Sequence, residues 1–198
     1  MPTSATARLP DGIVVVVKEE CATCHAVGSV LRQLADATTT TVYTQDDPRF
    51  PESPTPIHDA DLSVSWHHEI ETVPTVIRVI DGIEVERTVG WRRDDWERVT
   101  GVSGLGPDLP AMRPGCGSMT VDPDLVDELN VRFGASVLSS RRIDVAEAED
   151  DIEMMFTRGW SDGLPVVPPT EQRVMRMLTG TTRAPSDIVA IVPPDLVE

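Results

Sequence analysis

The chain of 198 residues carries 33 Asp and Glu against 17 Lys and Arg, a formal net charge of −16, and only 4% of its residues are aromatic. A surface this acidic repels the phosphates of DNA and RNA, so we expect no nucleic-acid partner. No apolar run reaches the roughly 18 residues that cross a bilayer, and the first ten residues lack the apolar core of a secretory signal. We therefore expect a cytoplasmic protein with no membrane partner, in a compartment where structural disulfides are rare.

The first hundred residues alternate between strand and helix patterns. Ile13 to Val17 is a continuous β-branched run, typical of a strand buried on both faces. Apolar residues at helical spacing from Val27 to Leu34 predict a helix after Cys24. The further elements expected in chain order are a strand at 39–44, a proline-rich loop at 45–59, a short helix at 61–69, strands at 76–80 and 83–89, and a helix at 92–99. This order predicts an α/β domain at 1–105, a mixed sheet flanked by helices.

The pattern changes beyond residue 105. Five glycines and three prolines from Gly101 to Gly117 indicate either a linker or an ordered excursion of the chain. Later segments favour helices at 122–133, 144–157 and 171–178, with short strands at Ile143 and 188–192. We therefore expect residues 106–198 to form a mainly helical C-terminal extension or a partial second domain.

Cys21 and Cys24 form a C-x-x-C motif between the predicted buried strand and the start of a helix. A thiolate at a helix N-terminus faces free backbone N–H groups, which lower its pKa. Cys21 is then the candidate nucleophile, and Cys24, one turn inside the helix, the candidate resolving thiol. The neighbouring carboxylates of Glu19 and Glu20 oppose ionisation of Cys21, so we expect a comparatively weak nucleophile.

The C-x-x-C motif and three other features occur in the order typical of the thioredoxin-like superfamily, which the sequence at about 9–102 therefore resembles. The features that carry this resemblance are the strand at 13–17, the C-x-x-C at a helix start, Val73-Pro74-Thr75, and the Asp81-Gly82 hairpin followed by Gly90. The resemblance implies a cis peptide bond before Pro74, which packs against the cysteine pair, and a substrate groove at Val73 and Thr75. It also implies thiol–disulfide oxidoreductase activity. Glu20 replaces the family's tryptophan, and Ala22-Thr23 replaces its Gly-Pro pair.

Cys116 lies in the segment Pro114-Gly115-Cys116-Gly117-Ser118, just past the predicted domain. Flanking glycines leave its backbone free and its thiol accessible. One interpretation makes Cys116 a third redox thiol that exchanges with Cys21. The other makes it a lone cysteine in a flexible loop.

Three other interpretations of the cysteines remain open. Cys21 to His25 spells C-x-x-C-H, the c-type haem attachment pattern, although that attachment normally requires export. A metal site is chemically feasible from Cys21, Cys24, His25 and Cys116, or with His67-His68, but the usual second ligand pair is absent. The cysteines can also be inert. We expect neither a cofactor nor a metal.

Gly159 to Thr170 is the most distinctive string outside the cysteine motif, and Thr170 is a candidate helix N-cap. The stretch from Gly159 to Leu178 is similar to a segment of bacterial proteins grouped with the UGSC-motif selenoprotein family, from which we carry over no activity. The main functional hypothesis is an oxidoreductase acting on a protein disulfide or on Cys116. The alternative is a non-catalytic interaction module that binds a partner subunit of a larger enzyme. The sequence does not specify an oligomeric state.

Overall fold

The computed structural model describes residues 8–134, 150–164, 166–184 and 187–188. The chain divides into two compact units, residues 1–129 and 130–198. The first unit therefore extends past the boundary at residue 105 that the sequence predicts. The structure shows why: residues 106–121 make hydrogen bonds and short strand pairings with the preceding part of the chain.

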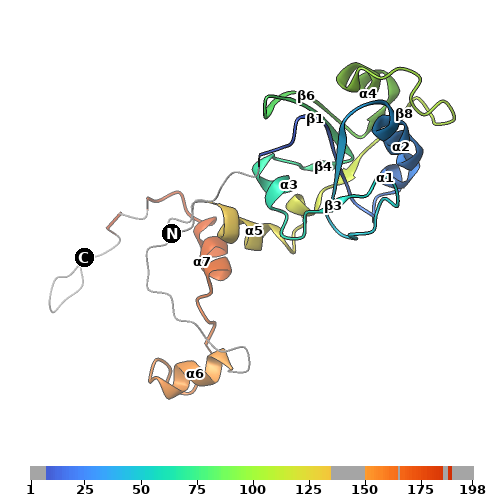
Figure 1. The fold of residues 1–198 in the computed structure, drawn as a ribbon. Coiled ribbons are helices and arrows are strands. Elements are labelled where there is room, and N and C mark those ends of the chain that lie inside the picture. Colours follow the sequence, from blue (N-terminus) through green and yellow to red (C-terminus); the bar gives the residue numbers. More distant parts are fainter. Residues whose placement is uncertain (1–7, 135–149, 165, 185–186, 189–198) are drawn as a thin grey trace. The chain divides into compact units, whose positions relative to one another are not determined.

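The first unit is built on a five-stranded mixed sheet (Figure 1), which confirms the α/β class and the mixed sheet. Its strands, in the spatial order β3-β2-β1-β5-β6, are β3 (Ile57–His58), β2 (Thr40–Thr44), β1 (Gly12–Val17), β5 (Thr75–Ile80) and β6 (Ile83–Val89). β1 runs parallel to β2 and antiparallel to β5. The β5–β6 hairpin turns at Asp81 and Gly82, which both have positive φ, as a tight hairpin turn requires.

The central strand β1 is the core of this unit. Val14 to Val17 have no exposed surface, which agrees with the two-sided burial expected of that β-branched run. The edge strand β6 differs, because Ile83 and Val89 are exposed.

Helices flank the sheet (Figure 1). They are α1 (Ala22–Ala26), α2 (Gly28–Ala37), α3 (Ser63–His67) and α4 (Arg93–Thr100). The single helix expected after Cys24 is two helices separated at Val27. α2 buries the predicted apolar stripe, and α4 buries Trp96 edge-on against Trp91 with ring centroids 5.1 Å apart.

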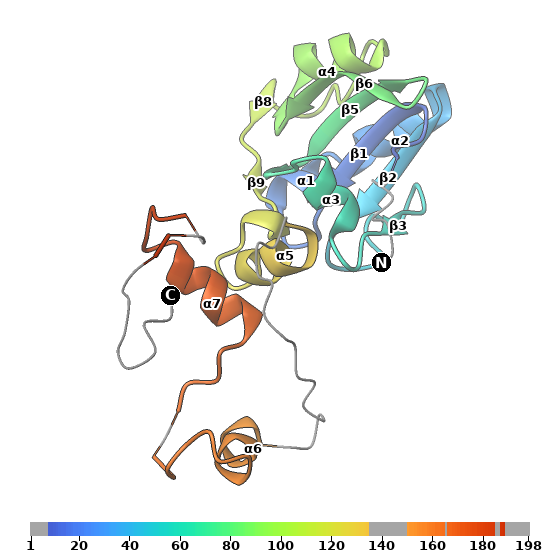
Figure 2. The same ribbon diagram turned by 90° about the vertical axis from the view of Figure 1, so that its left-hand side faces the viewer.

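The glycine- and proline-rich segment after α4 is an ordered excursion. Figure 2 shows its two short strands, β8 (Met112–Arg113) and β9 (Cys116–Gly117). β8 pairs with β7 (Trp91–Arg92), and β9 pairs with β4 (Thr72–Val73). A strand of two residues is too short to show an alternation of apolar and polar residues, so the sequence does not predict β8 or β9. A short 3₁₀ turn at Met119–Val121 follows.

The remaining helices are α5 (Val126–Phe133), which crosses the border between the units, and α6 (Asp151–Thr157) and α7 (Glu171–Leu178) in the second unit. The side chain of Thr170 caps α7, as expected. The predicted strand at Ile143, the start of the helix at 144–157 and nearly all of the strand at 188–192 lie outside the described residues. Among the helices that the structure describes, none combines the length and apolarity needed to cross a bilayer.

Candidate functional site

The three cysteines of the chain form one thiol cluster. The Sγ atoms of Cys21 and Cys116 lie 2.8 Å apart, although 95 residues separate them in the sequence. All three thiols are free in this structure. Cys21 and Cys24 have no exposed surface, whereas Cys116 is partly exposed. Cys116 therefore lies in contact with Cys21 and not apart from the C-x-x-C motif.

The start of α1 positions the Cys21 sulfur. Cys21 is the N-cap residue of this helix, and its Sγ accepts a hydrogen bond from the backbone N–H of Cys24 at 3.3 Å. The Cys21 thiol also lies 3.6 Å from the carbonyl oxygen of Val73, to which it donates. The sulfur is thus held between the first turn of a helix and strand β4.

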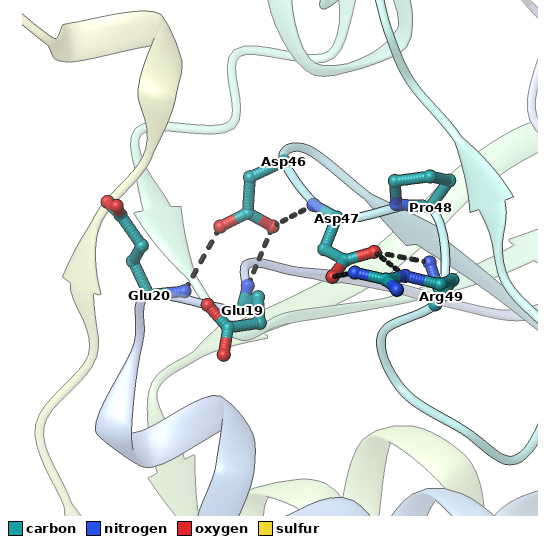
Figure 3. Close-up of a pocket in the computed structure, with 6 residues that line it drawn as sticks. All are labelled: Glu19, Glu20, Asp46, Asp47, Pro48 and Arg49. Atoms are coloured by element: carbon teal, nitrogen blue, oxygen red, sulfur yellow. Dashed lines mark hydrogen bonds and ion pairs between the residues drawn. The ribbon is translucent and has the colours of Figure 1, made fainter.

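The turn just before Cys21 is fixed by the Asp46 carboxylate (Figure 3). This carboxylate accepts hydrogen bonds from the backbone N–H groups of Glu19 at 2.7 Å, Glu20 at 3.0 Å and Asp47 at 2.8 Å. The side chain of Glu19 instead pairs with the His25 ring at 3.4 Å. Asp46 therefore anchors the backbone from which Cys21 projects.

Of the predicted groove residues Val73, Pro74 and Thr75, Val73 contacts the thiol cluster. The Val73–Pro74 peptide bond is cis, as the family resemblance implies, and Pro74 is buried. The carbonyl of Pro74 accepts a 2.7 Å hydrogen bond from the N–H of Gly90. The Thr75 hydroxyl donates to the Thr72 carbonyl at 2.5 Å. Val73 contacts Cys21 through its carbonyl oxygen, while the hydroxyl of Thr75 in β5 is bonded to the carbonyl of Thr72 in β4.

Strand β9 brings Cys116 to Cys21. It pairs antiparallel with β4, with Cys116 opposite Val73, and the pairing continues where the N–H of Ser118 meets the Glu71 carbonyl at 3.0 Å. On the side of the C-x-x-C motif, the Thr23 hydroxyl donates to the Pro114 carbonyl at 2.7 Å. The strand is therefore bonded both to the groove and to the motif itself.

A buried glutamine holds the chain that follows Cys116. Gln45 is 2% exposed, and its amide nitrogen donates to the hydroxyls of Ser118 at 2.7 Å and Ser65 at 2.8 Å. Its amide oxygen accepts from the N–H of Met119 at 3.1 Å. An unpaired buried polar group lowers the free energy of unfolding by about 1–3 kcal/mol. The Gln45 side chain therefore favours the observed course of the chain at Ser118 and Met119. Sequence reasoning missed Gln45 and the Thr23 contact, since neither belongs to a motif that marks it.

Gly115 is required where β9 passes over β4. A Cβ atom on Gly115 would lie 2.9 Å from the Val73 carbonyl oxygen and 2.4 Å from Thr72 Cγ2. A Cβ on Gly90, across the same crossing, would lie 2.8 Å from the Gly115 nitrogen. Any larger residue at either position must push the strands apart.

Burial and hydrogen bonding give the three thiols different acidities. Burial opposes ionisation of Cys21, but hydrogen bonds from Cys116, from Cys24 and from the backbone of the first turn outweigh it and lower the pKa of Cys21. Burial raises the pKa of Cys24 strongly, and burial together with the Cys21 sulfur raises the pKa of Cys116. Burial and hydrogen bonds, and not the neighbouring carboxylates of Glu19 and Glu20, are the main contributions to the pKa of Cys21.

The histidines show no arrangement that serves a metal. The His25 ring lies tilted against Phe50, with ring centroids 4.7 Å apart, and pairs with Glu19. His67 ends α3, and the carbonyl of His68 accepts from Arg87 at 3.0 Å. Within the part of the chain that the structure describes, no group of three or more His, Cys, Asp or Glu side chains is placed to hold a metal ion. The Gly159–Thr170 loop belongs to the second unit.

Comparisons with protein-family models, with curated proteins and with solved structures gave no match to this chain.

The Cys21 thiol should ionise at the lowest pH of the three. In a titration followed by ultraviolet thiolate absorption, we expect Cys21→Ser to abolish the first step. We expect Cys116→Ala to move that step to higher pH, because it removes a hydrogen-bond donor to the Cys21 thiolate. A first step that both substitutions leave unchanged would contradict this order of acidities.

The close approach of the Gly115 backbone to Val73 can be tested by comparing alanine substitutions at Gly115 and at Gly117. Gly115→Ala should destabilise the protein by about 1–3 kcal/mol and speed alkylation of Cys21, because its Cβ meets backbone at 2.9 Å. Gly117→Ala, whose Cβ would meet only Val121 Cγ2 at 3.7 Å, should stay within about 0.5 kcal/mol of the parent. Urea unfolding and timed alkylation measure both effects. Equal behaviour of the two variants would disprove tight packing of this strand.

Proposed function

We propose that the chain is a thiol–disulfide oxidoreductase of the thioredoxin-like class, with Cys21 as nucleophile and Cys24 as resolving thiol. The observation that carries this proposal is the position of Cys21 Sγ. It accepts a main-chain hydrogen bond from Cys24 at 3.3 Å and touches a second thiol, Cys116, at 2.8 Å. A sulfur so placed has both a stabilised thiolate and a neighbouring sulfur with which to exchange.

The acidities of the two motif cysteines suit this division of work. The lowered pKa of Cys21 favours the thiolate, which is the attacking species. The raised pKa of Cys24 keeps that thiol protonated until Cys21 is engaged in a mixed disulfide. The mixed sheet and the C-x-x-C motif at the start of α1 add support for the class.

The proposed reaction is a pair of exchanges. The Cys21 thiolate attacks one sulfur of a disulfide, the S–S bond breaks, and the other sulfur leaves as a thiolate that takes up a proton. Cys24 then loses its proton and attacks the Cys21 sulfur, which releases the first substrate sulfur. Two substrate thiols and a Cys21–Cys24 disulfide result, and the reverse sequence oxidises a dithiol. We place this chemistry in the cytoplasm, where thiols are kept reduced.

One observation favours a second candidate, a non-catalytic interaction module. Cys21 has no exposed surface, and a strand of the same chain covers it. In that case the three thiols would be structural, and the chain would serve as a subunit that binds a larger enzyme. The two candidates differ in whether the cysteines exchange.

The test uses the full chain equilibrated in glutathione buffers of graded redox potential. Rapid acid quenching, alkylation and peptide mass mapping then identify the disulfides. We expect a Cys21–Cys24 disulfide that forms and disappears reversibly with the buffer potential, and we expect Cys21→Ser to abolish it. If the wild-type protein forms no such disulfide in the most oxidising buffer, the oxidoreductase proposal fails and the interaction module is favoured.

A further inference from the structure

Strand β4 already has a partner from its own chain. The resemblance assigns Val73 to the substrate groove, and β9 occupies the antiparallel position opposite it. The Ser118–Glu71 hydrogen bond lengthens this pairing, and Gln45 and Thr23 fix the flanking chain. A protein substrate that needs to pair with β4 on this side must first displace β9.

The three thiols also differ in how solvent reaches them. Cys21 and Cys24 have no exposed surface, so a disulfide in solution reaches either one directly only when β9 moves away from β4. Cys116 is partly exposed, and it is the only cysteine in the chain with solvent-accessible surface. The buried pair can therefore exchange with disulfides in solution through Cys116, whose Sγ lies 2.8 Å from Cys21 Sγ.

From these two observations, and resting on the proposed function, we infer that Cys116 is the entry thiol of this protein. Small disulfides in solution react at Cys116, and β9 keeps protein disulfides from reaching Cys21. The substrates of this protein are therefore low-molecular-weight disulfides.

The reaction then has three balanced exchanges. Cys116 loses its proton and attacks a small disulfide, so that a mixed disulfide forms on Cys116 and one small thiol leaves. The Cys21 thiolate attacks the Cys116 sulfur, which forms a Cys21–Cys116 disulfide and releases the second small thiol. Cys24 then attacks Cys21, which closes the Cys21–Cys24 disulfide and restores the Cys116 thiol. A dithiol reductant returns the pair to the reduced state by the same exchanges.

Lys18 assists the first exchange electrostatically. Its ammonium group donates to the Gly117 carbonyl at 3.0 Å, beside the Cys116 backbone. Its positive charge favours the Cys116 thiolate over the thiol, against the effects of burial and of the Cys21 sulfur. Lys18 is also the only lysine in the chain. It acts here as a positioning residue for Cys116 and the strand.

The test follows single-turnover reduction of glutathione disulfide by the pre-reduced full chain. Cys116→Ser should slow this reaction by roughly tenfold or more, because the remaining thiols are inaccessible. The same variant should still form the Cys21–Cys24 disulfide at equilibrium with oxidised glutathione. In Cys21→Ser, the glutathione adduct should accumulate on Cys116, where peptide mapping locates it. A Cys116→Ser rate equal to or faster than wild type, in a protein that still forms Cys21–Cys24, overturns the inference but not the proposed function.

Reduction of insulin tests whether β9 excludes protein disulfides from Cys21. Wild type should reduce insulin slowly, and Gly115→Ala should reduce it faster because its Cβ forces β9 away from Val73. Gly28→Ala is the control, since its Cβ would meet nothing within 4 Å, and it should match wild type. If wild type reduces insulin as fast as Gly115→Ala, strand β9 does not exclude protein disulfides. If wild type forms no Cys21–Cys24 disulfide at all, both the inference and the proposed function fail.

Discussion

The antiparallel pairing of β9 with β4 is the contact on which the site depends. It places Cys116 opposite Val73 and within 2.8 Å of the Cys21 sulfur. Without this pairing, Cys21 would lose both its cover and a hydrogen-bonding neighbour that lowers its pKa. The same two-residue strand thus determines the acidity, the accessibility and the nearest exchange partner of the nucleophilic cysteine.

Several unrelated features of the chain keep that short strand in place. A two-residue pairing alone is weak, so its stability must come from its surroundings. Gln45 satisfies buried polar groups just beyond it, and Thr23 bonds it to the C-x-x-C turn. Gly90 and Gly115 allow the backbones to approach where a Cβ would clash. Asp46 fixes the opposite side of the site by holding the turn before Cys21.

The sequence predicted the helices and strands whose apolar residues recur at regular spacing. It did not predict the contacts between residues far apart in the chain. The valine run of β1, the apolar stripe of α2 and the Asp81-Gly82 hairpin are local signals, and the structure shows each of them. The path from Gly101 to Gly117 depends on pairings with distant residues, so composition showed only that it was irregular. Glu19 and Glu20 are not main contributors to the pKa of Cys21, and Glu19 pairs with the His25 ring, a contact that sequence adjacency does not predict.

The contact between Cys116 and Cys21 lies within one chain. Oxidation of Cys24→Ser at low protein concentration probes this contact, because the variant leaves Cys21 with a single neighbouring thiol. Non-reducing mass mapping should find a Cys21–Cys116 disulfide in the monomer, formed at a rate independent of protein concentration. A product that is mainly an intermolecular dimer, or a monomer that retains both free thiols, would show that the two sulfurs do not meet within one chain.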